Sequence, residues 1–221
     1  MIGDSEGIDC VLWDHDGVLV DTEPWFFQAT QSTLGDYSIH VSREEWGRLQ
    51  AAGQGLVRLV GSSAAAELDL VEVRRRRDEL YADLLRENDV LIDGALEVLG
   101  RARERFRMAL VTSSLRRFVD QLHGDTGLLD HFECIVTAEH CARHKPHPEP
   151  YLRALKGLGA TADRTVAVED SPRGLSSARA AGLRCFVIRS GFVADQEFAG
   201  AHAVLGDIRE LESLLELGSR V

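Results

Sequence analysis

A short apolar run that ends abruptly in two carboxylates constrains this chain more than any other feature. Residues 10–13 read Cys-Val-Leu-Trp, and Asp14-His15-Asp16-Gly17 follows directly. A short apolar run bounded by a turn signal is typical of a buried strand in a parallel sheet. Gly17 allows the chain to turn sharply after it. The sequence therefore predicts an α/β fold whose first strand carries Asp14 and Asp16 to the edge where open α/β sheets bind ligands.

The spacing of Asp14 and Asp16 also indicates a metal site. Buried carboxylates repel each other unless a cation or a shared proton intervenes, and oxygen ligands favour a hard cation, of which Mg²⁺ fits best. A surface turn is the alternative interpretation, because Asp and Gly are common turn residues. An EF-hand calcium loop is excluded, since Leu19 and Trp25 stand where that loop needs Gly and Glu.

Two further apolar runs end in polar residues in the same way. Residues 108–111 are followed by Thr112-Ser113-Ser114, and residues 165–168 are followed by Glu169-Asp170. Both runs read as buried strands, so their polar ends would meet Asp14 at one edge of the sheet.

A single lysine in a proline-rich stretch supplies a fixed cation. Lys145 opens the stretch Lys145-Pro-His-Pro-Glu-Pro-Tyr151, and Lys156 is the only other lysine, while 23 of the 25 basic residues are arginines. A chain that uses arginine almost everywhere else suggests that Lys145 is needed as a compact point charge. A plain solvated lysine is the alternative.

These four segments resemble, in order and spacing, the four motifs of the haloacid dehalogenase-like hydrolase superfamily. The stretch from Asp14 to Pro24 is similar to the first motif of the branch that holds β-phosphoglucomutases and small phosphatases. Residues 168–174 together with Ala180-Ala181-Gly182 resemble that branch's fourth motif. The resemblance implies a doubly wound parallel sheet with a Rossmann-like core and a small helical cap inserted after the first strand.

The resemblance also implies a role in phosphoryl transfer for each polar residue. Asp14 would be the nucleophile that forms an aspartyl-phosphate, and Asp16 would protonate the leaving oxygen and later activate water. The Thr112 hydroxyl and the Ser113 backbone N–H would bind the phosphoryl oxygens. Lys145 would hold its positive charge against those oxygens and against Asp14.

The resemblance further implies that Mg²⁺ is the cofactor. Asp14, Asp170 and the backbone carbonyl of Asp16 would bind it, and Glu169 would be a further ligand, directly or through water. Two alternatives stay open: Thr112 could cap a helix that starts near Leu115, and Glu169 could be a structural carboxylate.

Between residue 24 and about residue 88, helical periodicity replaces the strand-like runs. We expect helices over residues 24–34, 43–49, 56–66 and 70–87. By resemblance, residues 23–89 form the cap domain and residues 1–22 with 90–221 form the catalytic core domain. The charge run Arg74–Arg77 is expected to be a solvated face. The candidate substrate contacts in the cap are Trp25, Gln28, Gly53, Gln54 and Arg58.

The rest of the core alternates strands with helices, which argues for a doubly wound parallel sheet. Further strands are expected over residues 132–136 and 184–188, with an edge strand over 203–205. Leu96, Leu99 and Ala102 indicate a helix before the strand at Met108, and residues 208–217 are expected to form a closing helix.

The cap sequence separates members of the superfamily. Phosphonoacetaldehyde hydrolases need a cap lysine, and none lies between residues 24 and 90. Dehalogenases lack the second Asp of the first motif, which is Asp16 here. β-Phosphoglucomutases place a Ser-Arg pair after a cap glycine, plus a cap lysine, whereas this chain has Gly53-Gln54-Gly55-Leu56. We therefore predict a phosphatase acting on a small phosphomonoester, such as a sugar phosphate, with a phosphomutase as the alternative.

Two alternative functions from other classes of protein remain. A receiver domain of two-component signalling also phosphorylates an Asp, but its acidic pair is usually adjacent and not Asp-x-Asp on the first strand. A non-catalytic binding module is the other, and the complete set of polar groups speaks against it.

Composition and net charge limit the kinds of molecule that this chain can bind. The net charge of −11 makes nucleic acid an unsuitable partner. We expect no signal peptide and no membrane span, since no stretch reaches roughly 18 apolar residues. The four cysteines lack the spacing of a disulfide framework, which favours a reducing cytoplasm.

The cluster His140, Cys141, His144 and His147 matches no standard zinc pattern. A small phosphorylated metabolite is the expected partner, and a monomer or weak dimer the expected state.

Overall fold

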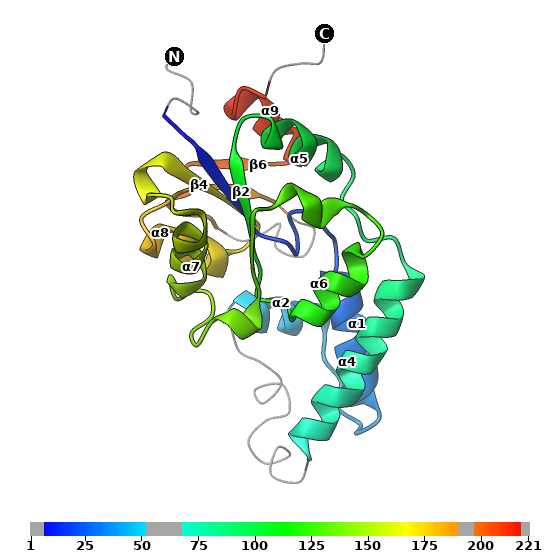
Figure 1. Ribbon diagram of the computed structural model, residues 1–221. Coiled ribbons are helices and arrows are strands. Elements are labelled where there is room, and N and C mark those ends of the chain that lie inside the picture. Colours follow the sequence, from blue (N-terminus) through cyan, green and yellow to red (C-terminus); the bar gives the residue numbers. More distant parts are fainter. Residues whose placement is uncertain (1–6, 52–67, 190–196, 218–221) are drawn as a thin grey trace. The chain divides into compact units, whose positions relative to one another are not determined.

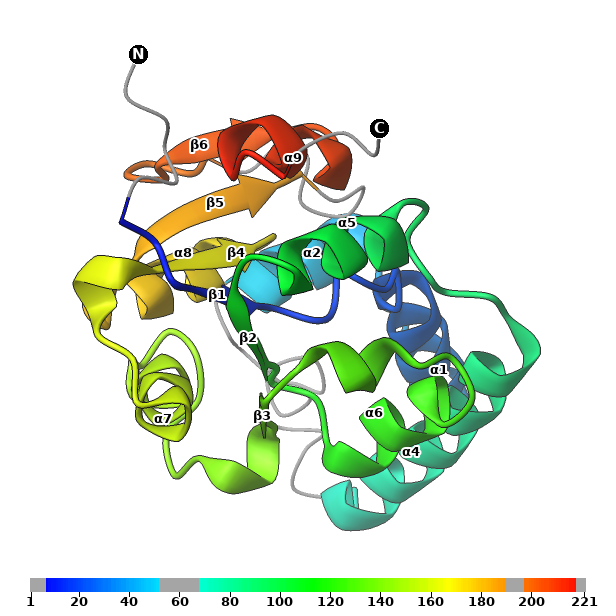
Figure 2. The same cartoon turned by 45° about the horizontal axis from the view of Figure 1, so that its top comes forward.

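The computed structural model describes residues 7–51, 68–189 and 197–217 (Figure 1). In these residues six parallel strands form one sheet in the order β3-β2-β1-β4-β5-β6 (Figure 2). The strands are β1 (Cys10–Trp13), β2 (Arg107–Val111), β3 (Cys134–Val136), β4 (Thr165–Glu169), β5 (Arg184–Ile188) and β6 (Ala203–Leu205). The predicted α/β class with a doubly wound parallel sheet is confirmed.

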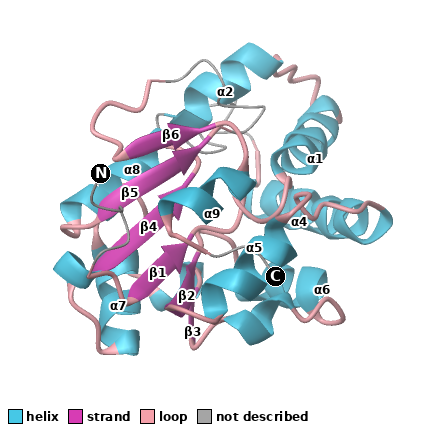
Figure 3. Cartoon of the chain, turned by 90° about the horizontal axis from the view of Figure 1, so that it is seen from above, coloured by secondary structure: helices cyan, strands magenta, loops and turns pink. Residues whose placement is uncertain are grey.

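Helices cover both faces of this sheet (Figure 3). They are α5 (Ala95–Arg103), α6 (Arg116–His123), α7 (Glu149–Leu158), α8 (Pro172–Ala180) and α9 (Leu211–Leu214), with 3₁₀ turns over Leu128–His131, Ala138–His140, Ala162–Arg164 and Ile208–Glu210. The closing helix is shorter than the predicted 208–217. It begins as a 3₁₀ turn, and α9 ends at Leu214, two residues before Glu216 takes a positive φ of 53°.

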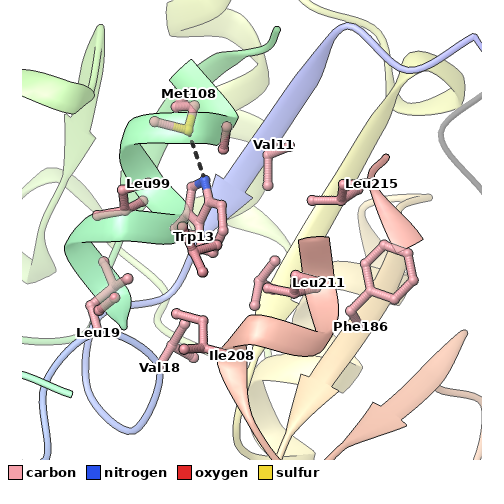
Figure 4. Close-up of a cluster of buried hydrophobic side chains, with 14 of the residues drawn as sticks. Val11, Trp13, Val18, Leu19, Leu99, Met108, Phe186, Ile208, Leu211 and Leu215 are labelled. Carbon is pink, nitrogen blue, oxygen red and sulfur yellow. Dashed lines mark hydrogen bonds between the residues drawn. The ribbon is translucent and has the colours of Figure 1, made fainter. Parts of the chain in front are cut away.

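The alternation of side chains along β1 divides the core into two layers. Val11 and Trp13 join the buried cluster that contains α5 and α9, and the Trp13 indole N–H donates a hydrogen bond of 3.2 Å to the sulfur of Met108 (Figure 4). Cys10 and Leu12 point the other way and join the cluster that contains α7 and α8. All four residues of β1 are buried, as expected for a strand in the middle of the sheet between β2 and β4.

The register of the central strands decides which residues meet at the carboxyl edge. Trp13 pairs with Leu110 of β2 and with Val168 of β4. The backbone N–H of Asp14 then donates to the carbonyl of Val168 at 2.9 Å. The residues that follow each of these three strands are therefore brought to one place.

Two compact units make up the chain: Met1–Asp21 with Leu91–Val221, and Thr22–Val90. The second is helical, with α1 (Glu23–Gly35), α2 (Arg43–Ala51) and α4 (Leu70–Glu87). The Phe26 ring of α1 lies 5.7 Å from the Trp46 ring and 5.1 Å from the Tyr81 ring, centroid to centroid. The predicted helix over residues 56–66, and the candidate contacts Gly53, Gln54 and Arg58, lie outside the described residues.

The charge run on α4 is only partly a solvated face. Arg75 is exposed and pairs with Glu72 and Glu79 on its own helix. The Arg77 side chain is 17% exposed, lies 4.7 Å above the Phe26 ring and pairs with Asp78. The expectation of a fully solvated run was therefore wrong for Arg77, because an aromatic ring on the neighbouring helix covers it.

Two simple findings complete the description. All four cysteines are free. Among the described helices, none combines the length and the apolar character that crossing a membrane would need.

Candidate active site

Lys145 lies at the carboxyl edge of the sheet with its ammonium group fully engaged. Its Nζ is 2.8 Å from Asp14 Oδ1, 2.6 Å from Glu169 Oε1 and 2.9 Å from the carbonyl oxygen of Val111. An ammonium carries three protons, so these three acceptors use all of them. Since the residue is 5% exposed, the alternative of a plain solvated lysine does not apply.

The lysine is held in place from the side of α7 and α8. The Tyr151 hydroxyl donates to the same Glu169 Oε1 at 2.6 Å, and the Arg173 guanidinium donates to the Lys145 carbonyl oxygen. At Gly174 an added Cβ would lie 1.8 Å from Glu169 Oε2, so only glycine lets α8 begin this close to the carboxylate. The fully buried Glu169 is thus fixed on both sides.

Like charges are crowded at this edge. Burial and then the neighbouring Glu169 carboxylate raise the pKa of Asp14 well above its ordinary value, while Lys145 acts in the opposite direction. Burial works against the charged form of Lys145, but Asp14 and Glu169 outweigh it and raise the pKa of the ammonium. Lys145 therefore stays charged, and its single positive charge does not balance the carboxylates around it.

Three carboxylates are close enough to share a cation. Ligand atoms of Asp14, Glu169 and Asp170 all lie within 4.8 Å of one another. Gly17 has a φ of +80°, and an added Cβ there would lie 2.0 Å from Asp170 Oδ2, so the turn after β1 approaches Asp170 as closely as a backbone can. Carboxylates and carbonyls at a strand edge are the donor set that suits Mg²⁺.

The Asp16 carboxylate belongs to a second group of contacts. Its Oδ2 accepts hydrogen bonds from Thr112 Oγ1 at 3.1 Å and from Ser114 Oγ at 2.8 Å. The Thr112 hydroxyl oxygen in turn accepts from the Ser114 backbone N–H at 2.9 Å. The alternative that Thr112 caps the following helix was wrong, since α6 has Leu115 at its N-cap and no side-chain cap bond.

The sequence prediction missed several residues of the site. Ser114 was recognised only as part of the polar end of β2, and Tyr151 only as the end of the lysine stretch, although both donate directly to site carboxylates. Ser113, which was expected to offer its backbone N–H, is exposed between Thr112 and Ser114, and that role stays a prediction.

The structure does not support a zinc site at the cluster of His140, Cys141, His144 and His147. His140 Nδ1 accepts from the Thr137 backbone N–H at 3.0 Å, and His147 Nδ1 accepts from the Glu149 backbone N–H at 3.1 Å. Both rings therefore organise the loop. Within the described part of the chain, the candidate metal group is the acidic one formed by Asp14, Glu169 and Asp170.

Comparison with known proteins identifies the family of this chain. The family model described as haloacid dehalogenase-like hydrolase matches residues 11–188. The chain belongs to this family. The predicted family is thereby confirmed, and in this hydrolase the strand-end carboxylates, the Thr112 hydroxyl and Lys145 lie within one set of contacts.

Individual relatives span nearly the whole hydrolase. Protein CbbY of Rhodobacter capsulatus is 30% identical over 213 residues, which cover 91% of this chain and 94% of the relative. N-acetylmuramic acid 6-phosphate phosphatase of Pseudomonas aeruginosa is 28% identical over 217 residues, or 95% of each chain. A crystal structure of CbbY from Rhodobacter sphaeroides in complex with xylulose-1,5-bisphosphate is 28% identical, covers 96% of this chain and 100% of that one, and superimposes with a TM-score of 0.81.

Proposed function

We propose that this hydrolase is a Mg²⁺-dependent phosphatase that cleaves a small phosphomonoester, such as a sugar phosphate, through an aspartyl-phosphate on Asp14. The observation that carries the proposal is the buried Lys145 ammonium between Asp14 and Glu169 at the edge of β1 and β4. One relative is a phosphatase named for a phosphorylated amino sugar, and the CbbY structure holds a sugar bisphosphate. Both support a small phosphorylated substrate.

Two carboxylates divide the reaction: Asp14, which contacts Lys145, and Asp16, which contacts Thr112 and Ser114. An Asp14 carboxylate oxygen attacks the phosphorus, the P–O bond to the leaving group breaks, and Asp16 gives the leaving oxygen a proton. In the second half Asp16 takes a proton from water, whose oxygen attacks the phosphorus and releases Asp14. The Ser113 N–H would donate to the phosphoryl oxygens, as would the Thr112 hydroxyl once it turns away from Asp16, and Lys145 would contribute its positive charge. Such donors and charges are most of what catalysis of phosphoryl transfer requires.

The crowding of carboxylates supports Mg²⁺ as the cofactor. Asp14, Asp170 and the backbone carbonyl of Asp16 would hold it, with Glu169 as a further ligand, directly or through water. A bound Mg²⁺ supplies positive charge that offsets the charge of the phosphoryl group and favours the ionised form of Asp14. Glu169 has a second role in either case, because its Oε1 already accepts from Lys145 and Tyr151.

We also propose that the helical unit Thr22–Val90 is the family's cap, which excludes water and supplies substrate contacts. Trp25 and Gln28 of α1 are the described candidates for such contacts. A cytoplasmic location and a monomeric or weakly dimeric state remain predictions; the four free cysteines are compatible with the former.

Phosphate release tests the proposal directly. The purified chain is assayed against sugar phosphates and p-nitrophenyl phosphate with Mg²⁺ and with excess EDTA. We expect release only with Mg²⁺, and we expect Asp14→Asn to abolish it, because the amide keeps the size of the side chain but removes its charge and nucleophilic oxygen. Thermal unfolding checks that the variant folds. Metal-independent release, or near-native turnover by the folded Asn variant, would contradict the proposal.

A further inference from the structure

Two buried histidines lie in contact beside Asp16. His15 follows Asp14 and is 1% exposed; His123 is the last residue of α6 and is 4% exposed. Their Nε2 atoms are 2.8 Å apart, and the rings meet edge to face with centroids 5.1 Å apart. On the far side, His123 Nδ1 is 3.2 Å from the Thr126 hydroxyl oxygen. Residues 108 apart in the sequence are thus joined into one line of polar atoms.

The inner end of this line is a buried nitrogen without a hydrogen bond. His15 Nδ1 has no partner that meets hydrogen-bond geometry, and it lies 3.3 Å from Asp16 Oδ2. A buried polar atom without a partner costs free energy. Catalytic hydrogen bonds are often long or poorly aligned before substrate binds and tighten afterwards.

Because Asp16 accepts, the donor and the acceptor of each hydrogen bond between Asp16 and Thr126 can be assigned. Asp16 Oδ2 already accepts from the Thr112 and Ser114 hydroxyls, so it is an acceptor toward His15 as well, and the His15 Nδ1 that faces it must carry the proton. In a neutral ring the His15 Nε2 is then an acceptor, and the His123 Nε2 must donate to it. His123 Nδ1 is left as an acceptor for the Thr126 hydroxyl, whose oxygen also accepts from the Leu128 backbone N–H at 3.2 Å. Every group in the line then has a compatible role.

The neutral form of His123 agrees with its surroundings. Burial, together with the neighbouring His15, lowers the pKa of His123 to about 4. The ring is therefore uncharged near neutral pH, as an Nε2 donor with an Nδ1 acceptor requires.

We propose that Thr126, His123 and His15 form a hydrogen-bond chain that orients the Asp16 carboxylate for its proton transfers. His15 and His123 are positioning residues, since neither has a predicted contact with the reacting atoms. Oδ2 accepts from Thr112 and Ser114 and faces His15 Nδ1 at 3.3 Å, so a His15 contact that tightens when substrate binds would fix which oxygen is held and how the carboxylate plane is turned. The proposal rests on the role of Asp16 in the proposed function.

Proton-detected ¹⁵N NMR of the histidine rings tests the chain without any assay of activity. In the wild-type protein at neutral pH we expect the ring proton of His15 on Nδ1 and that of His123 on Nε2, with Thr126→Val altering the His123 signals first. A proton on Nε2 of His15, or on Nδ1 of His123, would overturn the proposed direction. This result stands even if the wild-type chain proves inactive on phosphomonoesters, an outcome that would contradict the proposed function and not the hydrogen-bond chain.

Kinetics tests the consequence for Asp16. His123→Leu removes the donor to His15, whereas His123→Gln keeps an N–H near the position of Nε2. General acid catalysis typically contributes about 10²- to 10⁴-fold, so we expect His123→Leu to lower kcat on an alkyl phosphate by roughly tenfold, with little change in KM. The loss on p-nitrophenyl phosphate should be several-fold smaller, because that leaving group needs little protonation, and His123→Gln should restore most of the activity. Equal losses on both substrates, or no rescue by Gln in a folded variant, would contradict the positioning role.

Discussion

At the residue scale, Lys145 shows why this position needs a lysine in a chain that otherwise uses arginine. Its three acceptors surround one nitrogen: the carboxylate that directly follows β1, the carboxylate at the end of β4 and the carbonyl at the end of β2. A compact ammonium can donate in three directions from a point, whereas a planar guanidinium donates in a fork and needs more room. The constraint is therefore geometric as well as electrostatic.

Removing this charge should destabilise the chain. In Lys145→Met the two buried carboxylates lose their common partner, and breaking one side of a buried ion pair typically costs about 3–5 kcal/mol. The matched control is Lys156→Met, because Lys156 is the other lysine and is exposed on α7. Urea unfolding should show a large loss for the first variant and almost none for the second. Similar stabilities for both variants would mean that the carboxylates are balanced in some other way.

The buried His123 predicts a dependence of stability on pH. Its pKa falls from 6.5 to about 4 in the folded chain, so the unfolded chain binds more protons in this interval. The stability contributed by neutral His123 is complete above pH 6.5 and is lost as the pH falls toward about 4, up to roughly 3 kcal/mol. Urea unfolding of the wild type and of His123→Gln across this interval should show the wild type losing more stability. If the stability of the two proteins changed equally with pH, a neutral, buried His123 would be contradicted.

Sequence reasoning found the residues that end strands but not those that meet across the fold. Asp14, Thr112 and Glu169 were recognisable because each polar residue interrupts or follows an apolar run. The contact of His15 with His123 left no such signal, since His123 is one polar residue of an amphipathic helix and the pairing depends on tertiary packing.

At the element scale, the strands agree closely with prediction because their signal is local. β1 and β5 have the predicted bounds, since their apolar runs are bordered by charged or turn residues. The closing helix was predicted too long because the apolar spacing of residues 208–217 continues past the point where the backbone leaves the helix, near Glu216. Backbone dihedral angles at a single residue are not encoded in hydrophobic periodicity.

The turn after β1 offers a prediction about this element. Gly17→Ala meets two costs: a side chain at φ +80°, and a Cβ that would overlap the Asp170 carboxylate. Gly159→Ala is the matched control, because Gly159 also has a positive φ, at the end of α7, but has open space for a Cβ. A left-handed non-glycine residue costs about 1–2 kcal/mol, so Gly159→Ala should lose about that much stability and Gly17→Ala, which also crowds Asp170, should lose more.

Only Gly17→Ala should also lose phosphatase activity and weaken Mg²⁺ binding, because the added Cβ would push the Asp170 carboxylate out of its present position. Calorimetric titration with Mg²⁺ and phosphate release measure the two effects. If Gly159→Ala lost as much activity, general destabilisation and not displacement of Asp170 would be the cause.

At the scale of the whole molecule, the distribution of charge bears on the choice between phosphatase and phosphomutase. A mutase must hold a second phosphate while its intermediate turns over, which requires available cationic groups. Several described arginines of the helical unit are already paired with carboxylates of the same unit. They are Arg48 with Glu44, Arg75 with Glu72 and Glu79, Arg76 with Asp36, Arg77 with Asp78 and Arg86 with Asp83. A second phosphate that bound one of these arginines would have to displace its partner.

Water should therefore win the competition for the aspartyl-phosphate on Asp14. We predict that β-glucose 1-phosphate, supplied with Mg²⁺ and a glucose bisphosphate activator, yields inorganic phosphate at most and no glucose 6-phosphate. Phosphorus NMR distinguishes the two products, and a coupled dehydrogenase assay gives the same answer with greater sensitivity. The Asp14→Asn variant serves as the control for contaminating activity, because both reactions need the nucleophile.

Sustained formation of glucose 6-phosphate would overturn the prediction that this chain is a phosphatase. It would point to a phosphate-binding cation that the described pairs do not include, with Arg58, outside the described residues, as the first candidate for substitution.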